Sequence, residues 1–315
     1  MIIKVDFQNF WKGFEEKYHG GLSRSLIKLL EEDGIKFELD KINPDIIFFN
    51  AFGKITYKGP ALKIGYVTEP MTWFTEIIDN IKINYFDLVV GSVPNLKSKF
   101  IKLPLYLSVS NPRSMTKERI DEINKYVKEK VIEFDHNTKS GYNLKFCSLI
   151  NRHDNFKTRI PILRKIEKIG FVDCPGILNH NVKSFDEDGI SKVDYLKGFL
   201  FNICPENTPG NEGYITEKII QCSESGCIPI YHNHGFDDLD SRFFNLDRVI
   251  IYNPMDKKSL DDAYNKVKKL LDNEEELIKF YRQDVFHPDA HLVVNEIADN
   301  YKNKFKKFLK KNKLL

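Results

Sequence analysis

The stretch Phe199-Leu-Phe-Asn-Ile-Cys-Pro-Glu-Asn-Thr-Pro-Gly-Asn-Glu-Gly-Tyr-Ile-Thr-Glu-Lys218 passes from an apolar run, through a turn rich in Gly, Pro and Asn, into a predicted helix. Where a strand ends in such a turn and a helix begins, unpaired backbone N–H groups meet the positive end of the helix dipole, which favours an anion such as phosphate. Glu217 and Lys218 add a carboxylate and an ammonium in the first helical turn. The alternative interpretation is an ordinary helix cap, with Thr216 as the N-cap and two surface charges.

Short apolar strands alternate with helices on both sides of this stretch. In the second half of the chain the predicted strands are residues 145–150, 170–173, 199–203, 227–231 and 248–252. In the first half they are residues 2–7, 45–50, 62–67 and 87–91. This alternation is typical of parallel sheets covered on both faces, which bind ligands at the carboxyl ends of their strands. The sequence therefore predicts an α/β fold with two doubly wound, Rossmann-like domains that face each other across a cleft.

The predicted domain organisation has four segments. Residues 1–107 form the first domain and residues 144–289 the second. Residues 108–143 are charged, contain one amphipathic helix, and are predicted to connect the two domains. Residues 290–315 form a C-terminal helix with a basic tail.

The C-terminal helix is amphipathic. Tyr301, Phe305, Phe308 and Leu309 share one face, and lysines occupy the remainder. Two interpretations follow from this pattern. The apolar face packs back on the first domain, or the last dozen residues make a peripheral contact with an anionic membrane surface.

Composition narrows the class of protein. A chain of 315 residues that is 42% hydrophobic, with 24 Phe and 14 Tyr, can fill two packed cores and is not disordered. Residues 302–313 contain seven lysines and no acidic residue, so without them the formal charge of +3 becomes −4, and no nucleic-acid surface is predicted.

The five scattered cysteines are typical of reduced core residues. Because a signal-peptide pattern and an apolar run of roughly 18 residues are both lacking, we expect a soluble, cytoplasmic protein.

The stretch from Phe199 to Lys218 resembles the donor-domain signature of the α-1,3/1,4-fucosyltransferases of glycosyltransferase family ten. The similar residues are Phe199, Pro205-Glu-Asn207 and Gly213-Tyr-Ile-Thr-Glu-Lys218, followed after a helix by Gly226-Cys-Ile-Pro-Ile-Tyr231. Their order and spacing also agree, which makes the signal far more specific than a lone Gly-rich loop. The resemblance implies a fold of the GT-B type.

Other segments extend the resemblance. Lys145-Phe-Cys-Ser-Leu-Ile-Asn151, followed by Arg159, is similar to the segment in which these enzymes place a phosphate-binding arginine. In the first domain, Gly65-Tyr-Val-Thr-Glu69 and Lys102-Leu-Pro-Leu-Tyr106 look like segments of the family's acceptor domain.

The chain departs from the family pattern at Pro70, at Pro205 and at His232-Asn-His-Gly235. These departures leave the nucleotide-diphosphate chemistry intact. They bear on the acceptor and, to a lesser extent, on the donor sugar.

The resemblance assigns roles in donor binding. Arg159 offers a planar fork for phosphate oxygens and Lys218 a point charge, and together they stabilise the negative charge of a leaving diphosphate. Glu217 holds ribose or fucose hydroxyls. Asn207 and Tyr214 shape the nucleotide pocket.

An inverting transfer also needs a base that takes the proton of the acceptor hydroxyl. Glu69 is the candidate, because it ends a predicted strand of the first domain, and Pro70 holds its backbone extended. The alternative interpretation is a surface glutamate in a turn.

We predict no metal site and no obligatory cofactor, with a divalent cation at most stimulatory. Asp237-Asp-Leu-Asp240 imitates the Asp-x-Asp metal motif, but it follows a His/Gly turn and does not end a buried strand. Cys222 and Cys227 lack the second pair that a zinc site requires.

Together these patterns predict an inverting GT-B glycosyltransferase active in protein glycosylation. It would transfer L-fucose from GDP-fucose to an oligosaccharide or glycan acceptor, as an α-1,3 link to N-acetylglucosamine or glucose. Two alternatives stay open: a transferase that uses another nucleotide-activated deoxy-sugar, and a catalytically inactive relative that binds nucleotides or carbohydrates.

Overall fold

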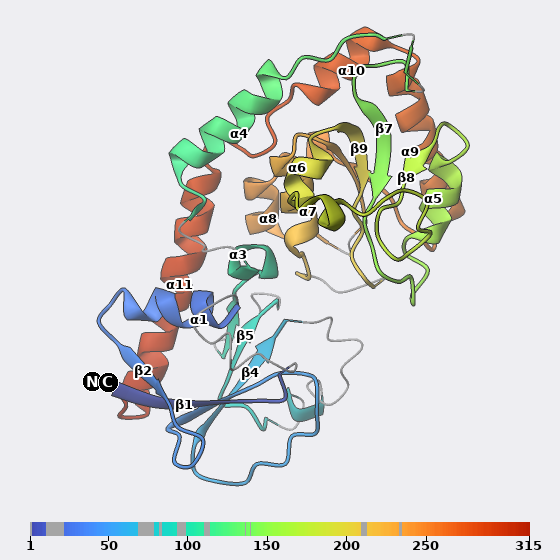
Figure 1. The fold of residues 1–315 in the computed structure, drawn as a ribbon. Helices are drawn as coiled ribbons and strands as arrows, with labels where there is room; N and C mark the ends of the chain where they lie inside the picture. The colour runs from blue at the N-terminus through green and yellow to red at the C-terminus, as the bar shows by residue number, and fades with distance from the viewer. Residues whose placement is uncertain are drawn as a thin grey trace. The chain divides into compact units, whose positions relative to one another are not determined.

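The computed structural model describes residues 2–10, 22–68, 79–81, 84–92, 99–109, 114–135, 137–138, 140–208, 213–232 and 235–315. The chain divides into two compact units (Figure 1). Unit 1 comprises Met1–Met115, Asn211–Ile215 and Leu292–Leu315, and unit 2 comprises Thr116–Gly210 and Thr216–His291. Each unit is built on one parallel sheet, which confirms the predicted α/β class.

Unit 1 contains a six-stranded sheet in the order β2-β1-β3-β4-β5-β6, with parallel pairing throughout. Its strands are β1 (Ile2–Gln8), β2 (Lys36–Leu39), β3 (Ile46–Phe49), β4 (Leu62–Val67), β5 (Leu88–Gly91) and β6 (Phe100–Lys102). The described helices of this unit include α1 (Leu22–Glu31), α3 (Leu105–Val109) and most of α11 (Ala290–Lys311).

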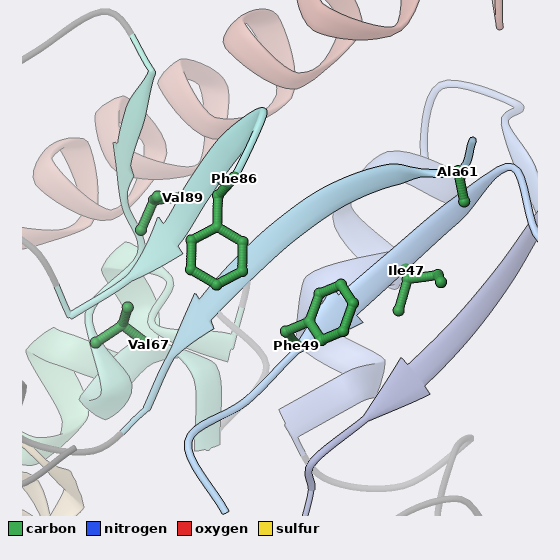
Figure 2. Packing of buried hydrophobic residues seen from close by; sticks show 6 residues of the cluster. All are labelled: Ile47, Phe49, Ala61, Val67, Phe86 and Val89. Carbon is green, nitrogen blue, oxygen red and sulfur yellow. The ribbon is translucent and has the colours of Figure 1, made fainter. Parts of the chain in front are cut away.

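One cluster of buried apolar side chains covers a face of this sheet (Figure 2). Ile47 and Phe49 of β3 point to the same side, as alternate residues of a strand do. Gly65 of β4 leaves room for Phe86, because a Cβ atom at this position would lie 3.1 Å from the Phe86 ring. The cluster members drawn in Figure 2 are Ile47, Phe49, Ala61, Val67, Phe86 and Val89.

Unit 2 contains a five-stranded sheet in the order β11-β10-β9-β7-β8, again with parallel pairing. Its strands are β7 (Lys145–Leu149), β8 (Val172–Asp173), β9 (Phe199–Ile203), β10 (Ile228–Tyr231) and β11 (Ile250–Ile251). From β7 the chain first runs outward to β8 and then returns to β9 on the other side of β7. The carboxyl ends of β7 and β9 therefore flank the topological switch point, where such sheets bind ligands.

The helices of unit 2 include a pair, α5 and α9, that pack against each other. The described helices are α4 (Lys117–Glu129), α5 (Ile160–Ile166), α6 (Lys192–Leu196), α7 (Glu217–Glu224), α8 (Asp238–Phe243), α9 (Lys257–Leu271) and α10 (Glu274–Tyr281), with short 3₁₀ turns η3 (Phe185–Asp188) and η4 (Leu246–Arg248). None of the helices in the described part of the chain is both long enough and apolar enough to cross a membrane.

The unit boundaries differ from the predicted segments within residues 108–143 and at residues 211–215. Residues 116–143, predicted as part of a connection, belong to unit 2. The reason is the buried Asn124 of α4, whose amide donates to the Phe286 carbonyl oxygen (3.0 Å) and whose amide oxygen accepts from the Val285 N–H (2.8 Å). Residues 211–215, predicted as part of the second domain, group with unit 1, where the Tyr106 N–H donates to the Ile215 carbonyl oxygen (3.2 Å).

The C-terminal helix α11 packs on unit 1 from Leu292 onward. The Tyr301 hydroxyl donates to the carbonyl oxygen of Leu26 in α1 (2.6 Å), and the Phe305 ring stacks on Phe48, with ring centroids 6.4 Å apart. Lys302 and Lys306 form ion pairs with Asp33 (2.9 and 2.8 Å). The apolar face of the helix is thus buried against its own chain, which confirms the packing interpretation.

Candidate functional site

A cavity of about 720 Å³ lies in unit 2 at the carboxyl ends of the strands. It is lined by the loops that follow β7, β8 and β9, by η3, by the first residue of α6 and by the first turn of α7. These elements surround the switch point between β7 and β9. A volume of this size is in the range of about 300–1,000 Å³ that small-molecule sites occupy.

Four of the predicted donor-site residues line this one cavity. They are Arg159, Asn207, Glu217 and Lys218, which come from three separate segments of unit 2. Tyr214 is buried and groups with unit 1, and it does not line this cavity. Glu69, together with Pro70, lies outside the described residues.

Arg159 is held in place by backbone and side-chain contacts. Its N–H donates to Asp154 Oδ1 (3.0 Å), which fixes the chain just before α5. Its guanidinium donates to the carbonyl oxygen of His153 and to Asn207 Oδ1 (2.6 Å). The side chain is therefore aimed before any ligand arrives, and Asn207 acts as its positioning partner.

Glu206 organises the other wall of the cavity, although its position in the sequence predicted no role for it. Its side chain is 1% exposed and accepts hydrogen bonds from the Thr216 N–H (2.8 Å), the Thr216 hydroxyl (2.9 Å), Lys218 Nζ (3.2 Å) and the Tyr231 hydroxyl (2.7 Å). It ties the loop after β9 to α7 and to β10. The signal that could have revealed it is its place in the Pro-Glu-Asn motif immediately after a buried strand.

Lys218 lies at the start of α7 and points to this carboxylate. Its Nζ also donates to Thr216 Oγ1 (2.7 Å), and Glu217 Oε1 lies 3.8 Å away. Burial opposes the charged form, but the carboxylates of Glu206 and Glu217 outweigh it, so the pKa of Lys218 is raised above its ordinary value. The ammonium is therefore a permanent cation at neutral pH.

The helix-cap interpretation of this segment is also correct in part. Thr216 is the N-cap of α7, and its hydroxyl oxygen accepts from the Lys218 N–H (3.4 Å). Capping and site formation are compatible, because the residues that follow the cap, Glu217 and Lys218, line the same cavity.

Two sequence features that imitate metal sites have structural explanations. Asp237 is the N-cap of α8 and forms a capping box with Asp240. The five cysteines are all buried and free, as predicted for core residues. Within the described ranges, no group of three or more His, Cys, Asp or Glu side chains is arranged to hold a metal ion.

The chain has two α/β units, each built on one parallel sheet, and unit 2 has a cationic cavity at the carboxyl ends of its strands. This is a fold of the GT-B type. Solved structures with this fold include an α1,3-fucosyltransferase with GDP (TM-score 0.66, 18% identity, covering 97% of this chain and 90% of that one). Another is an α1,3-fucosyltransferase with GDP-fucose (TM-score 0.63, 19% identity, covering 98% and 90%).

A sequence relative gives the more specific likeness. The chain is 26% identical over 259 residues to the α-(1,3)-fucosyltransferase FucT of Helicobacter pylori, and the match covers 72% of this chain and 48% of the relative. The chain thus spans about half the length of this curated relative. No protein-family model matches the chain. The resemblance to α-1,3-fucosyltransferases that the motifs indicated is confirmed by this relative.

Proposed function

We propose that the chain is an inverting glycosyltransferase that transfers L-fucose from GDP-fucose to a hydroxyl of an oligosaccharide or glycan acceptor. The observation that carries the proposal is the cavity of unit 2, in which Arg159 and Lys218 present two cations beside the carboxylate of Glu217. The likeness to α-1,3-fucosyltransferases supports an α-1,3 link. N-acetylglucosamine or glucose as the acceptor sugar and a role in protein glycosylation are part of the same proposal.

The chemistry of the donor half follows from these side chains. Breaking the bond between the sugar and the diphosphate leaves negative charge on the nucleotide, and preorganised cations stabilise it without having to reorient. Arg159, aimed by Asn207, supplies a fork for two phosphate oxygens. Lys218, held by Glu206 and Thr216, supplies a point charge.

The remaining roles concern the sugar and the acceptor. The side chain of Glu217 is 32% exposed, which leaves its carboxylate accessible to the hydroxyls of ribose or fucose. Glu69 is proposed as the base that takes the acceptor proton while the anomeric carbon is attacked from the opposite face.

The proposal is tested by incubating the protein with GDP-fucose on a glycan array. We expect fucose on a subset of glycans with terminal or internal N-acetylglucosamine or glucose. Glu69→Gln should abolish transfer and leave GDP binding unchanged, whereas Arg159→Ala should weaken GDP binding itself. Turnover by Glu69→Gln at the wild-type rate would exclude it as the base.

A different donor sugar is the second candidate. The observation that favours it is the departure from the family pattern at Pro205 and His232, both of which are buried in unit 2. A panel of nucleotide sugars with mass-spectrometric detection of hydrolysis separates the two donors. Binding of GDP without turnover on any acceptor would instead identify an inactive relative.

Three further properties belong to the same proposal. The reaction is proposed to need no obligatory cofactor, so chelation with EDTA should leave turnover within about twofold. A cytoplasmic location is proposed, and cell fractionation tests it. A peripheral membrane contact is proposed through the lysines of α11, because Tyr301, Phe305 and Leu309 are fully buried. Sedimentation with anionic vesicles tests this.

A further inference from the structure

The cavity of unit 2 contains another lysine to which neither the motifs nor the family resemblance gives a role. Lys192 is the first residue of α6, lines the cavity together with Arg159 and Lys218, and is half-buried. It comes from the segment between β8 and β9, so it approaches the site from a different element than the two predicted cations.

The surroundings of Lys192 are unlike those of nearby lysines. Lys183 and Lys197 each form an ion pair with an aspartate of their own segment, Asp188 and Asp194. Among the residues that the structure describes, none forms a hydrogen bond or an ion pair with the Lys192 ammonium. No described residue therefore competes with a ligand in the cavity for its three N–H donors.

The charges around Lys192 make an anionic ligand the matching partner. Burial and, next, the ammonium of Lys218 lower the pKa of Lys192, and the carboxylate of Glu217 offsets this only in part. Two ammonium groups that face one cavity repel each other, and a desolvated cation without a counter-ion is costly. A group with two or more negative charges between them would remove both penalties.

We propose that Lys192 is a third cationic contact for the diphosphate of the donor, in addition to Arg159 and Lys218. This assignment rests on the proposed function. The Lys218 ammonium already donates hydrogen bonds to Glu206 and Thr216, whereas the Lys192 ammonium donates none to described residues. Lys192 therefore adds a positive charge for the leaving nucleoside diphosphate, beside Arg159 and beside Lys218, whose charge Glu206 already offsets.

The test is a ligand series on matched variants. Binding of guanosine, GMP and GDP is measured by isothermal titration for the wild type, Lys192→Met, Lys192→Arg and the control Lys183→Met. We expect Lys192→Met to weaken GDP binding by about tenfold or more, since a charge-assisted contact is lost. Its affinity for guanosine should stay within about twofold, Lys192→Arg should keep most of the GDP affinity, and Lys183→Met should behave as the wild type.

Several outcomes overturn the assignment. GDP binding by Lys192→Met at the wild-type affinity would show that the lysine does not touch the diphosphate. An equal loss for guanosine and GDP would place it at the nucleoside instead. If the folded wild type fails to bind GDP at all, the proposed function fails and this role with it, so the two failures are distinguishable. Circular dichroism of each variant confirms that it is folded.

A pH titration supplies a second readout. The titratable groups that act on Lys192 are Lys218, Glu217 and Cys222 of α7 and Cys204 after β9. Because the pKa of Lys192 is lowered from 10.5 in the free protein while that of Lys218 is raised, GDP affinity should begin to fall at a pH below 10.5. Lys192→Met should lose less affinity than the wild type over this pH range, and an identical loss in the variant would contradict the assignment.

Discussion

Replacing Glu206 by glutamine should destabilise unit 2 and weaken the donor site together. The carboxylate is 1% exposed and accepts from Thr216, Lys218 and Tyr231. Glutamine keeps the shape of the side chain but offers one acceptor oxygen and turns an NH₂ group toward these donors. The buried ammonium of Lys218 then loses its nearest counter-ion.

The size of the expected loss in stability depends on the partners that Lys218 keeps in Glu206→Gln. Removing one partner of a buried ion pair typically costs about 3–5 kcal/mol, and a hydrogen bond to a charged group is worth about 1.5–3 kcal/mol. Lys218 keeps the Glu217 carboxylate at 3.8 Å and the Thr216 hydroxyl at 2.7 Å. We therefore expect the lower end of the range, a loss of about 3 kcal/mol in the free energy of unfolding.

Urea unfolding followed by circular dichroism measures this loss, and the data are fitted with two transitions because the chain has two compact units. The matched control is Glu129→Gln in α4, whose carboxylate is 66% exposed and pairs with Lys125 at 3.8 Å. This exposed pair should contribute less than about 0.5 kcal/mol. If Glu206→Gln loses no more stability than Glu129→Gln, Glu206 does not anchor the site.

Three further predictions concern other parts of the chain. Gly176→Ala should lower the free energy of unfolding by about 1–3 kcal/mol and weaken GDP binding, because the added Cβ would lie 2.5 Å from the Asn151 carbonyl oxygen. The control is Gly198→Ala, whose Cβ would lie 3.5 Å from its nearest atom. Equal stabilities of the two variants in urea would refute the steric argument. Tyr301→Phe should cost about 1 kcal/mol in urea unfolding, because it removes the 2.6 Å hydrogen bond to Leu26, and an unchanged midpoint would contradict this. The Asp40 carboxylate accepts hydrogen bonds from the Asn43 N–H, the Lys4 ammonium and the Ile42 N–H, and these lower its pKa from 3.8 to about 2. The stabilisation by Asp40 is therefore present above pH 3.8 and lost as the pH falls through about 2, so Asp40→Asn should flatten this acid loss in thermal melts, and an unchanged acid profile would count against it.

The sequence predicted the buried strands well because parallel strands covered on both faces are continuous apolar runs. β3 is Ile-Ile-Phe-Phe and is buried at every position, and β9 is buried along its whole length. The edge strands β2 and β6 escaped prediction. β2 is almost entirely exposed and β6 has three residues, so neither carries an apolar pattern of useful length.

The unit boundaries could not be predicted from local pattern. The charged segment around α4 has the composition of a connection, yet Asn124 joins it to Phe286, 162 residues away in the sequence. A pairing over that distance leaves no mark on local composition, periodicity or charge. The packing of α11 was predictable in kind, because an apolar face of aromatic residues requires a partner.

The candidate site was predictable where a motif covers it. Arg159 and Asn207 are 48 residues apart, and the family resemblance placed both in the donor site, where they are in contact. Glu206 was missed because its role arises only when Thr216, Lys218 and Tyr231 converge on it. Lys192 was missed for the same reason, since its proposed role depends on the cavity that it lines.

Isothermal titration of the purified chain with GDP measures whether the cavity of unit 2 binds the diphosphate of a guanosine nucleotide. We expect one saturable site for the wild type, with binding weakened about tenfold or more in both Arg159→Ala and Lys218→Ala and unchanged in Lys183→Met. Absence of GDP binding by the folded wild type, or binding of GDP by Arg159→Ala and Lys218→Ala at the wild-type affinity, would contradict it.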